Sequence, residues 1–390
     1  MLASKECEAP ILQTEHRIIF GDSGKLSGID DQSIDLIVTS PPYPMIEMWD
    51  EQFTQNNSEI TGYLATGEGG RAFETMHAEL DPVWQELCRV MKEGALACIN
   101  IGDATRRINE RFQLFANHSR IQRKFIELGF DLLPLILWRK QINAPNKFMG
   151  SGMLPAGAYV TLEHEYILIF RKGSKRVFAT AEDKHNRMLS SFFWEERNVW
   201  FSDLWDFKGA RQETGSSGLR ARSAAFPFIL PFRLVNMFSV FGDTVLDPFA
   251  GTGTANMAAM AAGRNSIGCE IESAFSGLIS ERILNELTLY NKYNYDRLKK
   301  HLEFVQNYSR EKGALKYSNS YFGFPVMTRQ ETDLKLAFVR AVEQFAYNTF
   351  KVSYLDDHYL QNLDFETLNP EDLYFGQWTQ PALFDETAGK

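Results

Sequence analysis

Four consecutive residues, Ser40-Pro41-Pro42-Tyr43, place hydrogen-bond acceptors beside a flat ring, directly after the apolar run 35–39. Proline fixes its φ angle and lacks an N–H, so the pair stiffens the turn and leaves the Pro41 carbonyl free to accept. The Ser40 hydroxyl is a second acceptor. Two acceptors that hold both hydrogens of an aromatic amine localise its lone pair, while Tyr43 can stack on the base. The stretch predicts activation of a base's exocyclic amine; the alternative is a rigid turn.

A second constellation is a glycine-containing loop between the apolar run 244–246 and the helical pattern 254–262. Glycines let the backbone approach a ligand closely, and Glu270, which ends the next apolar run, can hold ribose hydroxyls. The spacing differs from GxGxxG, and no P-loop lysine is present, so a triphosphate is not expected. We predict a nucleoside-type cofactor site; an ordinary strand-to-helix turn is the alternative. The loop reads Asp247-Pro248-Phe249-Ala250-Gly251-Thr252-Gly253-Thr254.

Two further features carry less information. Phe226-Pro227 lies just upstream of the glycine loop and, taken alone, is typical of a helix N-terminus with core aromatics. The cysteines show neither metal-ligand spacing nor a disulfide framework, so we expect reduced, mostly buried thiols and predict no metal site. The four cysteines are Cys7, Cys88, Cys98 and Cys269.

The composition is that of a soluble globular chain, with 390 residues, 44% hydrophobic and 23% charged. No apolar run is long enough to span a membrane, and the first residues lack a signal pattern, so the cytoplasm is the expected location. The net charge of −9 argues against a nucleic-acid partner, but residues 101–222 hold 20 Lys and Arg against 13 Asp and Glu. This basic middle fits a localised phosphate-binding face; an unevenly charged solvated surface is the alternative.

Short apolar runs bounded by turn residues alternate with helical patterns, which predicts a doubly wound α/β sheet. The stretch 45–75 is expected to be a loop or lid. The stretch 173–223 is rich in aromatic and basic residues, and the chain after about residue 281 is expected to be helical. The expected strands are 17–20, 35–39, 95–101, 132–138, 165–170, 244–246 and 265–268. The expected helices are 81–92, with Pro82 in its first turn, 119–128 and 254–262.

Taken together, these motifs resemble the β-class DNA amino-methyltransferases of the SPPY, cytosine-N4-like type, in which the catalytic half precedes the cofactor half. The family's SPPY, DPFxGxGT and IGxE elements match Ser40–Tyr43, Asp247–Thr254 and Ile267–Glu270, and its Phe-Pro and Gly-Asp elements match Phe226-Pro227 and Gly21-Asp22. The resemblance covers about residues 15–285. The chain departs from the family at 223–225, where a histidine is common, and at Phe275, where tyrosine is common.

The resemblance implies a mostly parallel seven-stranded methyltransferase sheet with S-adenosyl-L-methionine as cofactor. It divides the chain into a catalytic half (15–170), a target-recognition insert (171–222) and a cofactor half (223–285). Residues 286–390 lie outside the resemblance and are expected to form a helical C-terminal extension. The implied catalytic residues are Ser40, Pro41, Pro42 and Tyr43. The implied cofactor-binding residues are Asp22, Phe226, Pro227, Asp247, Pro248, Phe249, Gly251, Gly253, Thr254 and Glu270.

The resemblance also suggests the target. Serine at the first motif position favours cytosine N4 over adenine N6, and a base paired inside a duplex must be flipped out to react. Basic residues of the insert are candidates to contact DNA, with a solvated loop as the alternative; they are Lys208, Arg211, Arg220 and Arg222. The tryptophans of the insert are expected to form a local core rather than a base-stacking platform.

The expected partner is double-stranded DNA, together with a cognate restriction endonuclease if the protein belongs to a restriction-modification system. The oligomeric state is left open between monomer and homodimer. Two other interpretations stay open: methylation of RNA or of a protein amide, and a degenerate methyltransferase fold that only binds DNA. The intact motifs and their order favour the DNA enzyme.

Overall fold

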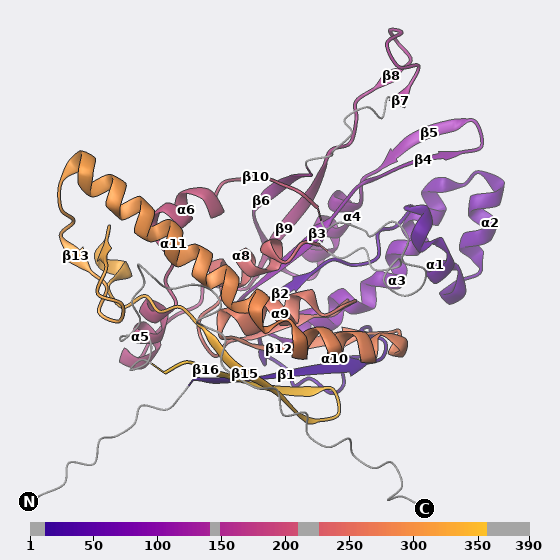
Figure 1. Ribbon diagram of the computed structural model, residues 1–390. Coiled ribbons are helices and arrows are strands. Elements are labelled where there is room, and N and C mark those ends of the chain that lie inside the picture. Colours follow the sequence, from indigo (N-terminus) through magenta and orange to yellow (C-terminus); the bar gives the residue numbers. More distant parts are fainter. Residues whose placement is uncertain (1–11, 141–148, 210–225, 357–390) are drawn as a thin grey trace, which may run out of the picture.

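The computed structural model describes residues 12–140, 149–209 and 226–356 (Figure 1). Their central element is a ten-stranded sheet in the order β10-β6-β9-β3-β2-β11-β12-β1-β16-β15. The strands are β1 (Gln13–Phe20), β2 (Ile34–Thr39), β3 (Met91–Ile101), β6 (Phe130–Lys140), β9 (His164–Lys172), β10 (Leu204–Phe207), β11 (Thr244–Asp247), β12 (Asn265–Glu270), β15 (Val339–Ala346) and β16 (Thr349–Tyr354).

The seven strands expected from the sequence are the seven inner ones, from β6 to β1, so the α/β sheet prediction is confirmed. Between β3 and β1 all neighbours are parallel, while β9 runs antiparallel to both β3 and β6. The structure adds β10 at one edge and the β15–β16 hairpin at the other. Parallel strands require crossover helices, and these cover both faces of the sheet.

Helices and small hairpins make up the rest of the described residues. The helices are η1 (Glu47–Trp49), α1 (Asp50–Asn56), α2 (Glu59–Thr66), α3 (Gly69–Val90), α4 (Asn117–Glu127), α5 (Ala181–Leu189), α6 (Trp194–Trp200), α8 (Ile229–Phe238), α9 (Thr254–Ala262), η2 (Ser273–Phe275), α10 (Ser276–Asn285), α11 (Leu287–Lys312) and η3 (Arg329–Glu331). Three hairpins stand apart from the central sheet: β4 (Ala104–Ile108) with β5 (Arg111–Phe115), β7 (Met149–Gly150) with β8 (Ala158–Tyr159), and β13 (Tyr317–Ser318) with β14 (Pro325–Val326).

Strand β2 shows how the sequence makes a two-faced core. All six of its residues are buried, and side chains alternate between the two faces of a strand. Ile37 belongs to the cluster under α3 and α4, whereas Leu36 and Val38 belong to the cluster under α8 and α9. A fully apolar strand is therefore required here, because neither face meets water.

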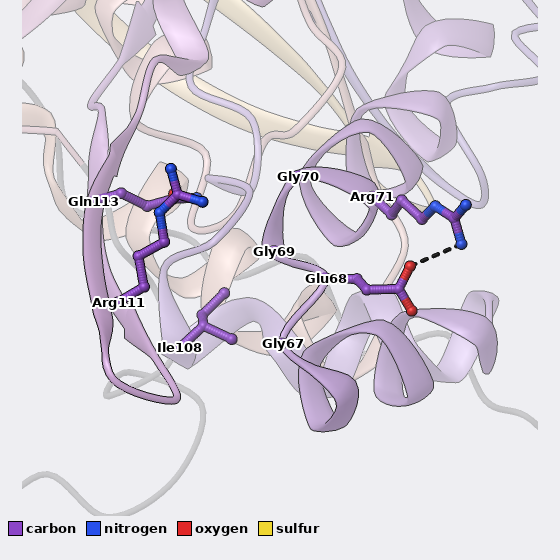
Figure 2. A pocket seen from close by; sticks show the side chains of 8 residues that line it. All are labelled: Gly67, Glu68, Gly69, Gly70, Arg71, Ile108, Arg111 and Gln113. Atoms are coloured by element: carbon purple, nitrogen blue, oxygen red, sulfur yellow. Dashed lines mark ion pairs between the residues drawn. The ribbon is translucent and has the colours of Figure 1, made fainter.

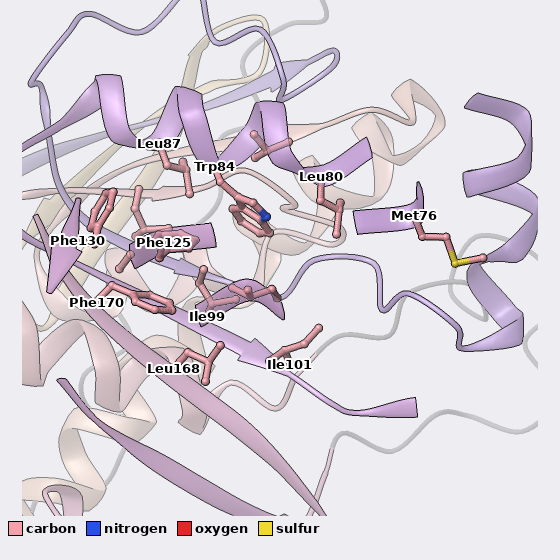
Figure 3. Packing of buried hydrophobic residues seen from close by; sticks show 14 of the residues in the cluster. Met76, Leu80, Trp84, Leu87, Ile99, Ile101, Phe125, Phe130, Leu168 and Phe170 are labelled. Carbon is pink, nitrogen blue, oxygen red and sulfur yellow. The ribbon is translucent and has the colours of Figure 1, made fainter. Parts of the chain in front are cut away.

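The α3 face of the sheet is the larger of these two cores (Figure 3). Trp84 of α3 packs near Phe125 of α4, with ring centroids 5.6 Å apart, and both rings are fully buried. Figure 3 shows them above Ile99 of β3 and Phe170 of β9. Replacing a buried aromatic of this size with alanine costs about 3–5 kcal/mol of stability, so this layer contributes strongly to the stability of the sheet.

The stretch 45–75, expected to be a loop or lid, is helical instead: it contains η1, α1, α2 and the start of α3. Phe53 and Ile60 are buried in the α3 core, which stabilises these short helices despite their polar composition. Because α3 begins at Gly69, Pro82 lies inside the helix and not in its first turn. Pro82 and Ala78 are exposed, so the carbonyl that loses its helical partner there faces water.

The C-terminal extension was expected to be helical and is only partly so. Helix α11 follows that expectation, but β15 and β16 come after it and extend the sheet beyond β1. Phe350, Val352 and Tyr354 alternate with more exposed residues and are buried against α9, α10 and α11. This period of two is a strand signal that the search for helices overlooked.

Two other expectations can be compared with the described residues. Cys98 and Cys269 are buried free thiols and Cys88 is half-buried, as predicted, while Cys7 lies outside the described residues. Burial raises the pKa of Cys98 and raises that of Cys269 to about 12. Among the described helices, none combines the length and the apolar character that crossing a membrane requires.

Candidate functional site

The two sequence motifs lie side by side because β2 and β11 are neighbouring parallel strands. Leu36 pairs with Val245 and Ile37 with Leu246, so the carboxyl ends of the two strands lie next to each other. Thr39 Oγ1 donates a 2.6 Å hydrogen bond to Asp247 Oδ1 across this junction. Carboxyl ends of parallel strands at which the connections diverge are the usual ligand sites of doubly wound folds.

The Asp247 side chain links the two loops by hydrogen bonds. Its carboxylate is buried and accepts hydrogen bonds from Thr39 Oγ1 and from the Phe249 backbone N–H, at 2.6 and 3.0 Å. Burial raises the pKa of Asp247 to about 7, although both hydrogen bonds favour the charged form. Its observed partners are thus structural, and its expected contact with a cofactor stays a prediction.

The glycine loop presents an open backbone surface. Gly251 and Gly253 have φ angles of +53° and +78°, in the left-handed region that favours glycine, and α9 starts directly afterwards at Thr254. A Cβ placed on Gly251 would meet no atom within 4 Å, so the space beside it is free for a ligand. The expected strand, loop and helix are all present, and 254–262 is helical over the predicted range.

Glu270 closes the other side of this loop. Its Oε2 accepts the Gly251 N–H at 2.8 Å, and its Oε1 accepts the Glu272 N–H at 2.9 Å. Burial raises the pKa of Glu270, and these backbone hydrogen bonds oppose the shift. A carboxylate oriented in this way keeps lone pairs for hydroxyl donors. Together with the open backbone of the loop, it fits the ribose of a nucleoside cofactor.

Of the remaining predicted cofactor residues, Asp22 lies beside the glycine loop, whereas Phe226 and Pro227 lie at the start of α8. The Gly21 N–H donates to the Glu270 carbonyl at 2.8 Å, which places the exposed Asp22 beside the end of β12. Ser23 donates to the Pro248 carbonyl and ties this turn to the glycine loop. Phe226 is buried in the core cluster under β2 and β11, and the Pro227 carbonyl accepts the Leu230 N–H at the start of α8.

Around Tyr43 the site is held by side chains from three other strands. The Tyr43 hydroxyl donates to Glu165 Oε2 at 3.1 Å and accepts from Asn100 Nδ2 at 2.8 Å. Asn100 Nδ2 also donates to Glu165 Oε2 at 2.7 Å, and Lys140 forms an ion pair with Glu165 Oε1. The Ser40 hydroxyl lies 3.0 Å from the Tyr43 hydroxyl oxygen.

The hydrogen bonds of the Tyr43 hydroxyl determine whether Ser40 donates or accepts in the Ser40–Tyr43 pair. Tyr43 has one hydroxyl hydrogen, and Glu165 takes it, so in the Ser40–Tyr43 pair Ser40 must be the donor. The lone pairs of Ser40 Oγ stay available for another donor. Burial and the charge of Glu165 raise the pKa of Tyr43 well above its ordinary value, so Tyr43 keeps this hydrogen. Ser40 is thus presented as an acceptor, which is what gripping an amine requires.

A hollow of about 190 Å³ opens beside this network. The ring of Tyr43 forms one wall, packed so closely on Gly102 that a Cβ there would lie 3.0 Å from the ring. Lys140 and Glu165 form another wall, and the remaining lining residues are Ile46, Asp103, Leu162, Glu163 and His164, together with Gly102. A hollow of this volume, with an aromatic ring as one wall, suits one aromatic base. The larger described hollow, of about 330 Å³, lies elsewhere, beside the β4–β5 hairpin (Figure 2).

Sequence reasoning missed Asn100, Lys140 and Glu165. Each stands near the end of a strand that the sequence did predict, but on a different strand, so no local motif joins them. Two polar residues in apolar runs were the available signal. Asn100 lies within the run 95–101, where the structure buries it, and Glu165 begins the expected strand 165–170. A polar side chain inside such a run needs a partner in the fold.

The residues expected to bind DNA are only partly described. Lys208 is exposed just after β10, whose Phe207 pairs with Lys140 at the edge of the sheet. Arg211, Arg220 and Arg222 lie outside the described residues. Trp200 and Trp205 are buried, as a core role predicts, but the packing is not local to the insert: Trp205 belongs to the cluster under α8 and α9, and Phe193 packs with residues of α11 and of 324–338. Trp194 is 40% exposed.

Known proteins share both the sequence and the fold of this chain. The family model described as DNA methylase matches residues 34–281. The type II methyltransferase M.MthZI of Methanothermobacter thermautotrophicus is 50% identical over 345 residues, which cover 88% of this chain and 96% of that protein. The type II methyltransferase M.MjaI of Methanocaldococcus jannaschii is 49% identical over 283 residues, covering 70% and 92%.

A solved structure extends the likeness to three dimensions. The protein TTHA0409 of Thermus thermophilus, crystallised in complex with S-adenosyl-L-methionine, is 33% identical, with a TM-score of 0.54. The match covers 70% of this chain and 94% of that one. The stretch matched by the family model contains the Ser40–Tyr43 turn, the glycine loop Asp247–Thr254 and Glu270 at the end of β12.

Proposed function

Because this chain belongs to the DNA methylase family of N6 and N4 amino-methyltransferases, we propose that it methylates the N4 amine of a cytosine flipped out of a specific duplex sequence. DNA methyltransferase activity follows from the family; the choice of cytosine is the proposal. The observation that carries the choice is the serine at the first motif position, Ser40, which favours cytosine in the family that the sequence resembles. Donation of the Ser40 hydrogen to Tyr43 leaves the Ser40 lone pairs free to accept from the amine, which supports amine methylation in general. Adenine N6 is the alternative, because its amine needs the same two acceptors.

S-adenosyl-L-methionine is the cofactor and, when bound, supplies an electrophilic methyl group on a sulfonium centre. Glu270 is placed to accept hydrogen bonds from the ribose, and the backbone around Gly251 lines the open side of the site. Asp22 stands at the same edge. When the cofactor is bound, these residues would hold it beside the loop that begins at Ser40, because β2 and β11 are neighbouring parallel strands.

The catalytic loop prepares the base. Ser40 Oγ and the Pro41 carbonyl accept the two amine hydrogens, and the Tyr43 ring stacks on the base in the hollow that it lines. A neutral serine is too weak a base to take a proton from the amine, so Ser40 only accepts a hydrogen bond and the proton leaves after methyl transfer. Nothing in this scheme requires a covalent bond between enzyme and base, so no catalytic cysteine is expected.

The decisive experiment identifies the methylated atom. The protein is incubated with radiolabelled cofactor and unmethylated plasmid DNA, which is then digested to nucleosides and separated. Label in N4-methylcytosine supports the proposal, and label in N6-methyladenine assigns the alternative. Cofactor and duplex binding without any transfer would instead favour a degenerate fold that only binds DNA, and label on RNA or protein would overturn the substrate class.

The cellular setting belongs to the same proposal. Both relatives described above are type II methyltransferases, which supports a role beside a cognate restriction endonuclease. We place the protein in the cytoplasm, where it acts on double-stranded DNA as a monomer or a homodimer. Growth of a host that carries the methyltransferase and then receives the matching endonuclease tests the restriction-modification setting.

A further inference from the structure

Two hairpins project from the sheet at the same end as the catalytic loop, and we call them the two arms (Figure 1). The first arm is β4–β5, and the second is β7–β8 with the turn between its strands. The arms touch each other: the rings of Phe112 and Tyr159 are stacked, with centroids 4.9 Å apart and planes 20° apart. Within the described residues, the two arms thus form one projecting unit.

Both arms begin or end within a few residues of the lining of the hollow beside Tyr43. Gly102 and Asp103 line that hollow, and β4 begins at the next residue, Ala104. On the other side, β8 ends at Tyr159, and Leu162 already lines the hollow. A DNA strand that delivers a base to this hollow must therefore pass along the arms.

The second arm exposes apolar side chains at its turn. Met153 is 89% exposed and Leu154 is 69% exposed, and they are neighbours in sequence. At the base of the arms, Leu114 is 53% exposed and Val160 is 91% exposed. Apolar side chains gathered on one projection mark an interaction surface. Methionine and leucine are among the residues that proteins insert between base steps of bent duplexes.

The first arm carries two arginines that form no ion pair within the described residues. They are Arg107 and Arg111, and both are exposed. Other arginines nearby are paired: Arg106 pairs with Asp50, and Arg71 pairs with Glu68 on the side of the hollow opposite Arg111 (Figure 2). Unpaired arginines beside exposed apolar groups fit a phosphate backbone better than they fit an apolar protein partner.

We infer that the two arms grip duplex DNA on either side of the flipped base, a role that rests on the proposed function. Arg107 and Arg111 contact phosphates and set the position of the duplex. Met153 and Leu154 press into the base stack and favour the flipped state. The sequence placed DNA recognition in the insert 171–222, whereas this inference assigns the grip to residues 104–115 and 149–160.

The charge of the first arm is tested with the double variant Arg107→Ala/Arg111→Ala. Its matched control is Arg310→Ala/Lys312→Ala, which removes the same charge from exposed positions at the end of α11. Fluorescence anisotropy with a mixed-sequence duplex gives affinity as a function of salt. We expect at least tenfold weaker binding near 0.1 M salt and a slope of log affinity against log salt about two units flatter, while the control keeps both values. Equal behaviour of the two double variants would overturn the inference.

The apolar turn is tested with Met153→Ser/Leu154→Ser. This variant should keep the salt slope but lose about tenfold in turnover on duplex DNA, with a smaller loss on single-stranded DNA, where no base has to be flipped. Equal losses on both substrates, or no loss, would contradict the role. If the turn instead binds a protein surface, the variant will change sedimentation without DNA and leave duplex binding intact, which also contradicts it.

These outcomes separate the two levels of the proposal. Wild-type protein that labels no DNA base refutes the proposed function itself. If wild-type protein is active and the arm variants match the controls in activity and in DNA affinity, only the proposed role of the arms is refuted. Cofactor affinity, measured by calorimetry for every variant, must stay at the wild-type value and confirms that the variants are folded.

Discussion

The two halves of the site are oriented by different groups, the cofactor half by backbone N–H groups and the catalytic half by side chains. In the cofactor half of the site, around Glu270, backbone N–H groups of Gly251 and Glu272 orient the Glu270 carboxylate. In the catalytic half, around Ser40, side chains from different strands orient Tyr43 and, through it, Ser40. A site held by backbone is compact in sequence, whereas a site held by side chains is spread over the chain. Substitutions should therefore separate binding from turnover along this division.

The largest separation is expected for Ser40→Ala. Loss of one acceptor from the amine should lower kcat by about 10²–10³-fold, the range found when one preorganised hydrogen-bonding group is removed. Cofactor affinity should stay the same, because the groups around Glu270 lie on other strands. Steady-state kinetics and calorimetry measure the two effects, with Ser27→Ala, an exposed serine, as control. A fully active variant would remove Ser40 from the mechanism.

The opposite pattern is expected for Glu270→Gln. A hydrogen bond to a charged group contributes about 1.5–3 kcal/mol, so cofactor affinity should fall about tenfold to hundredfold, while kcat at saturating cofactor changes little. Titration calorimetry measures the affinity. Glu272→Gln is the matched control, because its side chain is exposed and two residues away. If kcat falls and cofactor affinity stays the same, the division between the cofactor half and the catalytic half of the site is wrong.

A smaller effect should reveal how Ser40 is oriented. Glu165→Gln weakens the acceptor that takes the Tyr43 hydrogen, and Tyr43→Phe removes the acceptor that takes the Ser40 hydrogen. Each should lower kcat about tenfold with little change in the KM for DNA. Because both act through the same Ser40 hydrogen, the double variant should be no slower than either single variant. Losses that multiply would show that the two residues act independently.

The smallest effect on activity, and a distinct effect on stability, is expected for Asp247→Asn. The folded-state pKa of about 7 lies above the ordinary 3.8, so the folded protein holds a proton that the unfolded chain releases. The stabilisation from Asp247 is therefore complete below about pH 4 and is lost as the pH rises to 7. Denaturant unfolding at pH 5 and pH 8 should show wild type losing on the order of 2 kcal/mol relative to the variant. A constant difference would mean that Asp247 titrates normally.

The sequence allowed prediction of what local geometry determines. The seven inner strands, the range of α9, and the meeting of the Ser40 turn with the Gly251 loop follow from apolar runs, glycine positions and the order of the motifs. The family model then confirmed the enzyme class. The positions of single cofactor contacts, such as that of Asp22, stay predictions.

What escaped prediction depends on contacts between distant residues. Nothing near Glu165 in the sequence shows that its carboxylate meets Asn100, Lys140 and Tyr43, because a side-chain network exists only once the strands are adjacent. The helices in 45–75 depend on burial of a few apolar residues such as Phe53 against α3. Composition made this stretch look like a loop, but tertiary packing outweighs weak local preference.

The placement of β1 has a consequence for biosynthesis. This strand precedes the other described strands of the sheet in the chain, yet its two neighbours are β12 and β16, and β16 ends at Tyr354. The backbone groups of residues 13–20 therefore stay unpaired on one side until residues 349–354 have been synthesised, at about 5–20 residues per second. Chains truncated before residue 349 would leave one side of β1 open to pairing with other chains, so nascent and cleaved forms should aggregate more readily than the finished protein.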